Sequence, residues 1–152
     1  MSNLTFSVTG ESSSATKFIG HTRQFKVIID EPETLGGTDD FPNPVEYILA
    51  GFAGCINVVG HVVAKELGFA INSLKIEVHG DLNPERFLGH SNKERAGFKS
   101  IKLHLIPDTE ASIETLTKWL QIVEERCPVK DNLQNNTPIS IAVEKEYNVS
   151  KS

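Results

Sequence analysis

The sequence predicts an α+β domain in which antiparallel sheets pack around two long helices. Alternating apolar residues over 23–30, 73–83 and 98–106 are typical of half-buried strands. Two further segments, 44–67 and 112–127, repeat apolar residues every three or four positions, as helices do. The chain has 152 residues, of which 39% are hydrophobic, and this is enough for one domain to bury its own core.

Short strands are expected before the first helix. Segments 4–8 and 15–20 precede the strand over 23–30, in which Phe25 and Val27 lie on one face with Ile29. A loop rich in Gly, Pro and Asp follows.

The first helix has clear boundaries in the sequence. Asn43 is a good N-cap, Pro44 suits the first helical position, and Glu46 lies three residues after the cap, as in a capping box. Gly68 ends the helix after Lys65. Its apolar positions form two stripes, which predict a largely buried helix: Ile48, Phe52, Cys55, Val59 and Val62, and Leu49, Ile56 and Val63.

The second half of the chain continues the same alternation of elements. A polar excursion separates the strands over 73–83 and 98–106, and Asp108 is expected to cap the helix that ends on Cys127. Pro128 then permits a short helix, and the segment 139–147 is predicted to close the chain as a strand.

Composition excludes several classes of function. The formal net charge is −5 and no basic run occurs, so nucleic acid is not an expected partner. No run approaches the roughly 20 apolar residues of a membrane span, and no secretory leader is visible at the N-terminus. A cytoplasmic protein without a membrane partner is therefore expected.

The chain has two cysteines, Cys55 and Cys127. In a reducing compartment such a pair is either two inert buried thiols or a redox couple. Both lie on core-facing stripes, so packing of the two helices would bring them within disulfide reach. Cys127 precedes Pro128 and follows Arg126, and a helix N-terminus and a cation both favour a thiolate.

The stretch GFAGC, residues 51–55, places two glycines in one turn of this helix. Glycine destabilises a helix by about 1 kcal/mol relative to alanine, so the small residues need a reason. Either another element packs closely against Gly51 and Gly54, or a small molecule must reach Cys55. Periodicity leaves both readings open.

Other candidate sites are weaker. Glu46 and Cys55 lie nine residues apart, about 900° along a helix, and therefore on opposite faces. Within one straight helix Glu46 is thus a capping residue, and a catalytic role needs a bend, an intermediary or a partner subunit. The five histidines have no metal-ligand spacing, and no Gly-rich phosphate loop follows a strand.

Three runs of the sequence resemble the OsmC/Ohr family of thiol-dependent hydroperoxide reductases. They are IIDEPETLGGTDDFPNPVEYILAGFAGC, INVVGHVVAKELGF and EERCPVKDNLQNNTPISI, and the resemblance extends from about Phe25 to Tyr147. It implies a single domain of this kind over residues 1–152. It also implies an intertwined homodimer with two sites at the subunit interface.

The resemblance implies a cysteine-based peroxidase acting in the oxidative stress response. Cys55 matches the peroxidatic position and Cys127 the resolving one. The substrates implied are organic hydroperoxides, with hydrogen peroxide as a further candidate, and an external thiol restores the enzyme. No metal, flavin or haem cofactor is expected. Ile48, Phe52 and Val59 are expected to line the site and to suit an alkyl tail.

The family lowers the pKa of its reactive cysteine with an arginine held by a glutamate. The position of that glutamate, ten residues before the cysteine, is Val45 here, and Glu46 follows one residue later. The family's arginine aligns nearer Lys17, whereas Arg23 is the arginine found in the N-terminal strands. Glu46 and Arg23 are the candidate activating residues, and a solvated strand charge is the alternative reading of Arg23.

A second function remains open on the sequence. The NPVEY form resembles a broader OsmC-like branch with less uniform activity. The shifted glutamate and the displaced arginine also suit a catalytically weak or inactive dimer that binds a small apolar or thiol ligand.

Overall fold

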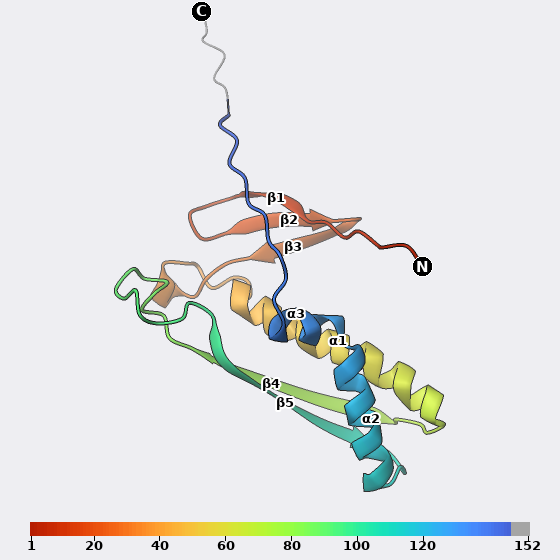
Figure 1. Ribbon diagram of the computed structural model, residues 1–152. Coiled ribbons are helices and arrows are strands. Elements are labelled where there is room, and N and C mark those ends of the chain that lie inside the picture. The colour runs from red at the N-terminus through yellow and green to blue at the C-terminus, as the bar shows by residue number, and fades with distance from the viewer. Residues whose placement is uncertain (147–152) are drawn as a thin grey trace, which may run out of the picture.

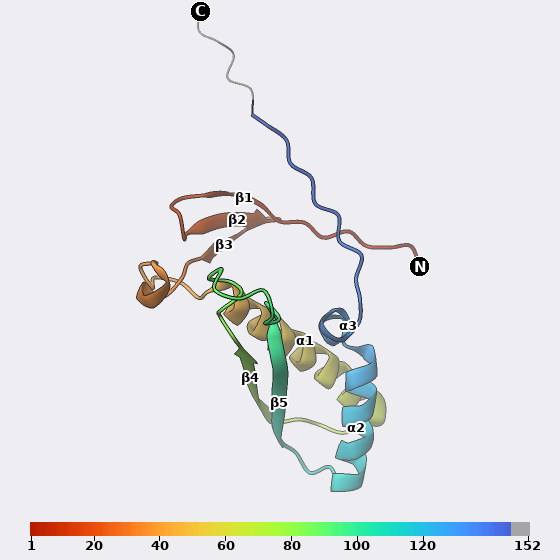
Figure 2. The ribbon, with the colours of Figure 1, turned by 60° about the vertical axis from the view of Figure 1, so that its left-hand side comes forward.

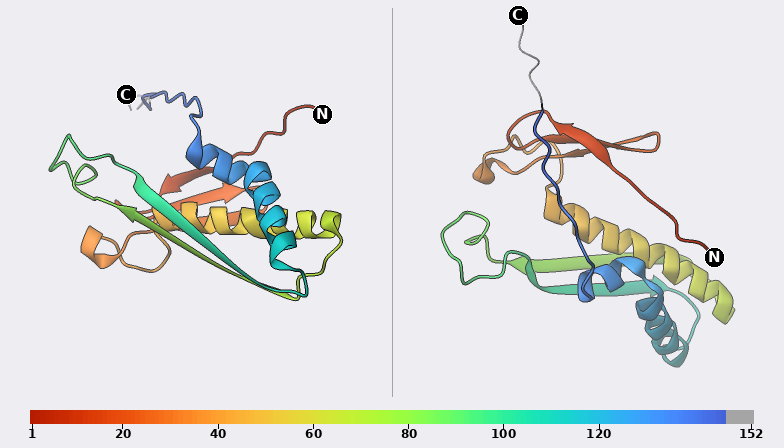
Figure 3. Two further views of the ribbon diagram at one scale, coloured as in Figure 1. Left: turned by 60° about the horizontal axis from the view of Figure 1, so that its bottom comes forward. Right: turned by 45° about the horizontal axis from the view of Figure 1, so that its top comes forward.

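The computed structural model describes residues 1–146 as an α+β fold with two antiparallel sheets and three helices (Figure 1). The elements are β1 (Thr9–Ser12), β2 (Phe18–Thr22), β3 (Phe25–Ile29), a 3-10 turn (Glu33–Leu35), α1 (Pro44–Leu67), β4 (Ser73–Leu82), β5 (Phe98–Asp108), α2 (Ile113–Arg126) and α3 (Pro128–Gln134). The three-stranded sheet and the β4–β5 hairpin lie on opposite sides of α1 (Figure 1 and Figure 3).

The N-terminal sheet has the order β1-β2-β3. Thr9 pairs with His21 at one end of the β1–β2 ladder, close to the turn that joins β2 to β3. The strand predicted over 4–8 is therefore wrong: these residues run past the end of β2 and find no paired strand there. Leu4 and Phe6 remain 74% and 84% exposed.

Helix α1 begins and ends as the sequence predicts. Asn43 Oδ1 accepts the Glu46 backbone N–H at 2.8 Å, and Glu46 Oε1 accepts the Asn43 N–H at 2.9 Å, which completes a capping box. Gly68 ends the helix in the left-handed region at φ 81°, where a glycine avoids the strain of a side chain. The Tyr47 hydroxyl donates to the Ile28 carbonyl at 2.7 Å and connects α1 to β3.

Helix α1 is also long and apolar enough to span a membrane, judged by length and composition alone. The sequence-based expectation that no run approaches such a span is wrong in this respect. The core helix of a soluble protein meets the same criteria, and α1 buries Phe52, Ile56 and Val63 in the core of this chain.

The β4–β5 hairpin packs one face against the helices. Its apolar residues face the core cluster built on α1 and α2: Leu74, Ile76, Val78, Ile101, Leu103 and Leu105. The polar excursion over 83–97 joins the two strands, and the Arg86 guanidinium braces it by donating to the carbonyls of Asn92 and Glu94.

The N-cap of helix α2 lies four residues later than the expected cap. Asp108 is the last residue of β5, where it pairs with Ser73. Ser112 is the N-cap instead, and its hydroxyl accepts the Thr115 N–H at 3.1 Å. Continued strand pairing outweighs the local capping preference of the aspartate.

Trp119 of α2 fixes the crossing of α2 over α1. Its indole N–H donates to the Gly60 carbonyl at 2.7 Å, and the side chain is 2% exposed. A Cβ at position 60 would lie 3.1 Å from the indole ring, so the buried indole would have to shift slightly to admit any side chain larger than that of glycine. The Phe69 ring packs edge-on against the indole, with ring centroids 6.2 Å apart.

The segment after α3 contradicts the predicted last strand. Residues 139–146 form no strand, and Tyr147 lies outside the described residues. The segment runs past the three-stranded sheet, away from the β4–β5 hairpin (Figure 1 and Figure 2). Ile139, Ile141 and Val143 are 80%, 87% and 95% exposed, because none of residues 1–146 covers their side chains.

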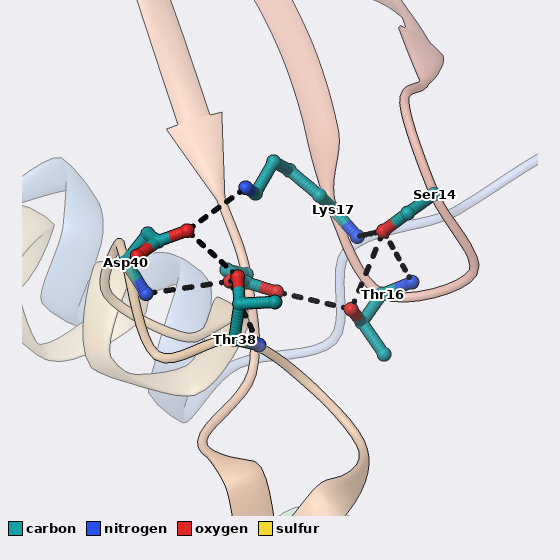
Figure 4. A network of polar contacts seen from close by, with 6 residues as sticks. Ser14, Thr16, Lys17, Thr38 and Asp40 are labelled. Atoms are coloured by element: carbon teal, nitrogen blue, oxygen red, sulfur yellow. Dashed lines mark hydrogen bonds and ion pairs between the residues drawn. The ribbon is translucent and has the colours of Figure 1, made fainter.

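A polar network joins the N-terminal sheet to the loop before α1 (Figure 4). The fully buried Asp30 carboxylate accepts the Thr38 hydroxyl at 2.6 Å and the Thr16 hydroxyl at 3.0 Å. Lys17 pairs with Asp40 at 3.1 Å beside it. The hydrogen bond from Thr38 is the main cause that holds the pKa of Asp30 well below its usual value, and burial opposes it.

We expect Asp30→Asn to lower Tm by about 5 °C at pH 7, because an amide cannot replace the carboxylate as an acceptor of several N–H and O–H groups. The folded-state pKa of Asp30 is depressed, so its stabilisation is present above the unfolded-state pKa of about 4 and is lost as pH falls below it. Thermal melts at several pH values should show the difference between the two proteins narrowing below about pH 4. Asp39→Asn, at an exposed residue, is the control; equal Tm values for the two variants would contradict the prediction.

Candidate functional site

The structure brings the two cysteines together. Cys55 lies on α1, Cys127 lies between α2 and α3, and their sulfur atoms are 3.1 Å apart. Both are free thiols. The two residues are 72 positions apart in the sequence, so this contact depends on how the helices pack.

The exposure of the two thiols differs. Cys127 is 1% exposed and belongs to the core cluster with Trp119 and Val123, whereas Cys55 is partly exposed at the edge of that cluster. A small molecule would therefore meet Cys55 first.

The first turn of α3 contacts the sulfur of Cys127. Cys127 is the N-cap residue of α3, and its Sγ accepts the Lys130 N–H at 3.4 Å. The sequence-based expectation that Cys127 begins a short helix is confirmed.

Burial raises the pKa of the Cys55 thiol above its ordinary value. The Val129 N–H acts in the opposite direction, and the neighbouring Cys127 thiol raises the pKa further. Within this chain, Cys55 is therefore mostly the neutral thiol at pH 7, whereas attack on a peroxide needs the thiolate.

Arg126 does not supply the compensating charge. Its guanidinium forms a bidentate ion pair with the Glu66 carboxylate, with N–O distances of 2.6 and 3.1 Å. The expectation that Arg126 favours a Cys127 thiolate is not supported, because the guanidinium is bound to Glu66 on α1.

The two candidate activating residues lie elsewhere in the chain. Glu46 is held in the α1 capping box, and Arg23 adopts φ 50° in the β2–β3 turn, where its guanidinium lies 4.9 Å from the centre of the Phe25 ring. Over residues 1–146 neither of them hydrogen-bonds to Cys55. A catalytic role for Glu46 or Arg23 remains a prediction.

The glycines beside Cys55 have open space around them. A Cβ built at Gly51 or Gly54 would meet no other atom within 4 Å. The close packing that the sequence suggested as one reason for these glycines is therefore not made by the described part of the chain, residues 1–146, in which this face of α1 is open.

A cleft of about 710 Å³ lies between α1, β5, α2 and α3. Its apolar lining comes from Val45, Ile48, Phe52, Ile56, Phe98, Ile101, Leu103, Leu120 and Leu133. Polar side chains also line it: Arg95, Lys99, Ser100, Glu124, Lys130 and Gln134.

The sequence identified only part of this cleft. Ile48 and Phe52 were expected from the helical stripe, whereas Val59 packs against the core cluster instead. Nothing in the local sequence of β5 or α3 marks residues such as Leu103 or Lys130 as cleft residues, because they meet α1 only through the tertiary fold. Among residues 1–146, no cluster of His, Cys, Asp and Glu could hold a metal ion.

Comparisons with known proteins agree on the fold. The family model of OsmC-like proteins matches residues 37–142. An OsmC-like protein from Mycoplasma pneumoniae is similar in structure, with a TM-score of 0.76 and 21% identity over 88% of this chain and 89% of that one. An organic hydroperoxide resistance protein from Elizabethkingia anophelis gives a TM-score of 0.65 and 17% identity over 89% and 91% of the two chains.

A third similar structure is the organic hydroperoxide resistance protein OsmC from Legionella pneumophila, with a TM-score of 0.64 and 17% identity over 90% of this chain and 93% of that one. No curated protein matches the chain in sequence. At these identities the solved structures establish the fold, and the family model covers most of the chain. The chain is therefore a member of the OsmC-like protein family.

Proposed function

We propose that the protein is a thiol-dependent hydroperoxide reductase, in which Cys55 is the peroxidatic and Cys127 the resolving cysteine. The observation that carries the proposal is the pair of free thiols with sulfur atoms 3.1 Å apart, one partly exposed and one buried. Similar folds include organic hydroperoxide resistance proteins, which supports the same reading.

The proposed reaction needs no metal or organic cofactor. The Cys55 thiolate attacks a peroxide oxygen, the O–O bond breaks, and the alcohol leaves after it takes up a proton. Cys55 becomes a sulfenic acid. The Cys127 sulfur then attacks that of Cys55, which releases water and forms the disulfide. Two equivalents of an external thiol, or one dithiol, reduce the disulfide.

The cleft is the proposed site for the organic part of the substrate. Phe52 and Ile56 line it from α1 and are sequence neighbours of Cys55. Neither cysteine lines the cleft itself, so we propose that the alkyl group occupies the cleft while the peroxide group reaches Cys55 beyond its edge. Hydrogen peroxide has no group to occupy this apolar surface. Organic hydroperoxides are therefore the favoured substrates.

A homodimer is proposed because apolar surface remains unpaired. Val58 and Val62 of α1 are 62% and 44% exposed on the side of the helix that carries the open Gly51 and Gly54. Segments 4–8 and 139–146 carry exposed apolar residues at alternating positions, which is the pattern of strands that have no partner strand. A second copy would cover both kinds of surface.

The second copy is also the proposed source of activation. Within the chain, burial keeps Cys55 protonated, and Arg23 lies on an exposed turn. We propose that Arg23 of the second copy approaches Cys55 at the interface. A cysteine pair that an external thiol must reduce fits the reducing cytoplasm, where the protein would serve as an antioxidant.

One observation favours a second candidate function. The raised pKa of Cys55, together with a Glu46 occupied in a helix cap, suits an OsmC-like dimer that binds a small apolar or thiol ligand without reducing peroxides. The two candidates differ in whether Cys55 oxidises at neutral pH.

Mass spectrometry after one equivalent of an alkyl hydroperoxide at pH 7 tests the proposed reaction. We expect a Cys55–Cys127 disulfide in the wild type, no oxidation in Cys55→Ser, and a sulfenic adduct that overoxidises at Cys55 in Cys127→Ser. Normal turnover of Cys127→Ser with a dithiol would contradict the resolving role. Absence of oxidation over minutes in the wild type would leave the ligand-binding function.

Substrate preference can be measured separately. We expect kcat/KM for an alkyl hydroperoxide to exceed that for hydrogen peroxide by about tenfold or more, since burying a few methylene groups contributes about 0.8 kcal/mol each. Leu103→Ser should reduce this ratio by adding a hydroxyl to the cleft, while Leu35→Ser, in the 3-10 turn, should not. Equal rates for both peroxides would contradict the preference.

The pH dependence of Cys55 alkylation tests the activating residues. If Arg23 of the second copy approaches Cys55, the wild-type midpoint lies below pH 8, and Arg23→Gln raises it by about one pH unit or more. Lys26→Gln removes a cation from the same sheet and is the control, so it should leave the pH midpoint of Cys55 alkylation unchanged. Glu46→Gln should also have little effect if Glu46 only caps α1, because glutamine fills the same capping role. A wild-type midpoint above pH 9 would argue against activation.

The oligomeric state tests the proposed interface. We expect a dimer for the wild type and mainly monomer for Val58→Glu by light scattering, because the new carboxylate would be buried without a partner. Ile113→Glu, at a 79% exposed residue at the start of α2, is the control and should remain dimeric. A monomeric wild type would contradict the proposal.

A further inference from the structure

We infer that α3 is a redox-sensitive wall of the cleft, which loosens when Cys55 and Cys127 form a disulfide. In the reduced protein the Cys127 sulfur caps the first turn of α3, and disulfide formation displaces that sulfur. The inference concerns the regulation of the proposed site, and its consequence for turnover rests on the proposed function.

The first turn of α3 uses the Cys127 sulfur as its cap. The Lys130 N–H donates to Cys127 Sγ at 3.4 Å, and the same sulfur lies 3.1 Å from Cys55 Sγ. The Lys130 N–H is one of the N–H groups that lack a carbonyl partner at the start of any helix. No side-chain oxygen caps this end of α3.

Helix α3 contains seven residues and none of them is buried, although Val129 packs partly against the core cluster. A helix of this length is not stable by itself in water. The Asn132 side chain donates to the Pro128 carbonyl and the Asn135 side chain to the Asp131 carbonyl. The Lys130 N–H has the Cys127 sulfur as its partner, so the first turn should respond to a change at that sulfur.

Oxidation changes this cap directly. When the Cys127 thiol displaces hydroxide from the Cys55 sulfenic acid, a water molecule leaves and an S–S bond of about 2.05 Å replaces the 3.1 Å contact. Cys127 Sγ must move toward Cys55 to form this bond, which changes the geometry of the hydrogen bond that it accepts from the Lys130 N–H. The Lys130 N–H is then less well satisfied, which destabilises the first turn.

The same turn forms part of the cleft. Lys130 and Leu133 of α3 line it together with Ile48 and Phe52 of α1. A looser α3 offers less fixed apolar surface to a ligand. In the proposed cycle, the reduced protein would hold the alkyl tail of the peroxide, and the disulfide form would release the alcohol.

Hydrogen exchange at the α3 amides tests the inference. The disulfide is formed with diamide, so the measurement does not depend on peroxidase activity. We expect the amides of residues 129–131 to exchange about fivefold faster or more in the disulfide form, the size of effect of a lost N-cap. Amides of α2 over residues 117–124 should not change. Equal or slower exchange of the α3 amides in the disulfide form would overturn the inference.

Two variants at one position separate the cap from the disulfide. Cys127→Ser keeps a capping acceptor and cannot form the disulfide, so its α3 amides should remain protected after diamide. Cys127→Ala lacks the acceptor, and its α3 amides should exchange as fast in reducing buffer as those of the wild-type disulfide. Slow exchange in Cys127→Ala would overturn the inference even if the disulfide form could not be prepared.

The link to the cleft has its own readout. Octanol, a model of the product alcohol, should bind the reduced protein several-fold more tightly than the disulfide form in an NMR titration. Equal affinity would overturn the coupling between α3 and the cleft. If diamide and octanol give the expected results but peroxide does not oxidise Cys55, the proposed function fails and the redox response of α3 stands.

Discussion

The contact between Trp119 and Gly60 determines most of what is distinctive about this chain. The indole packs on a position without a side chain and donates to its carbonyl at 2.7 Å, which fixes where α2 crosses α1. Cys127 follows Trp119 by two turns and Cys55 precedes Gly60 by little more than one, so this crossing also fixes the distance between the thiols. The thiol contact, the start of α3 and the α3 wall of the cleft all depend on it.

On the proposed function, the thiol pair meets two opposing requirements. A resolving cysteine must be close to its partner and shielded, and Cys127, which is 1% exposed and 3.1 Å from Cys55, suits that role. Burial of Cys55 itself disfavours the thiolate that the proposed reaction needs, because it raises the pKa of that thiol. The Val129 N–H acts against this effect without overcoming it. The chain by itself would thus position the proposed redox pair well and activate it poorly.

Local sequence signals were sufficient to predict the helices, but they could not predict which distant segments pair with one another. Asn43, Glu46 and Gly68 marked the ends of α1 because capping depends on residues a few positions apart. Periodicity placed both cysteines on core-facing stripes, but only the packed structure shows their contact. Strands failed where no neighbour exists, as at 4–8 and 139–146, since alternation predicts a strand only if a sheet edge is available. The burial of Asp30 had no local signal either, because Thr16 and Thr38 meet it from two different loops.

The proposed second copy of the chain would explain both the unpaired segments 4–8 and 139–146 and the open face of α1. Covering Gly54 and Val58 would remove water from the side of α1 next to Cys55. Removal of water alone would raise the pKa of Cys55 further and make the thiol less reactive. A dimer therefore activates Cys55 only if it brings a cation with the surface that it buries, and the two effects must arrive together. Dimerisation would then also make Cys55 reactive. A dimer that brings no cation to Cys55 would instead have the alternative function, binding a ligand without reducing peroxides.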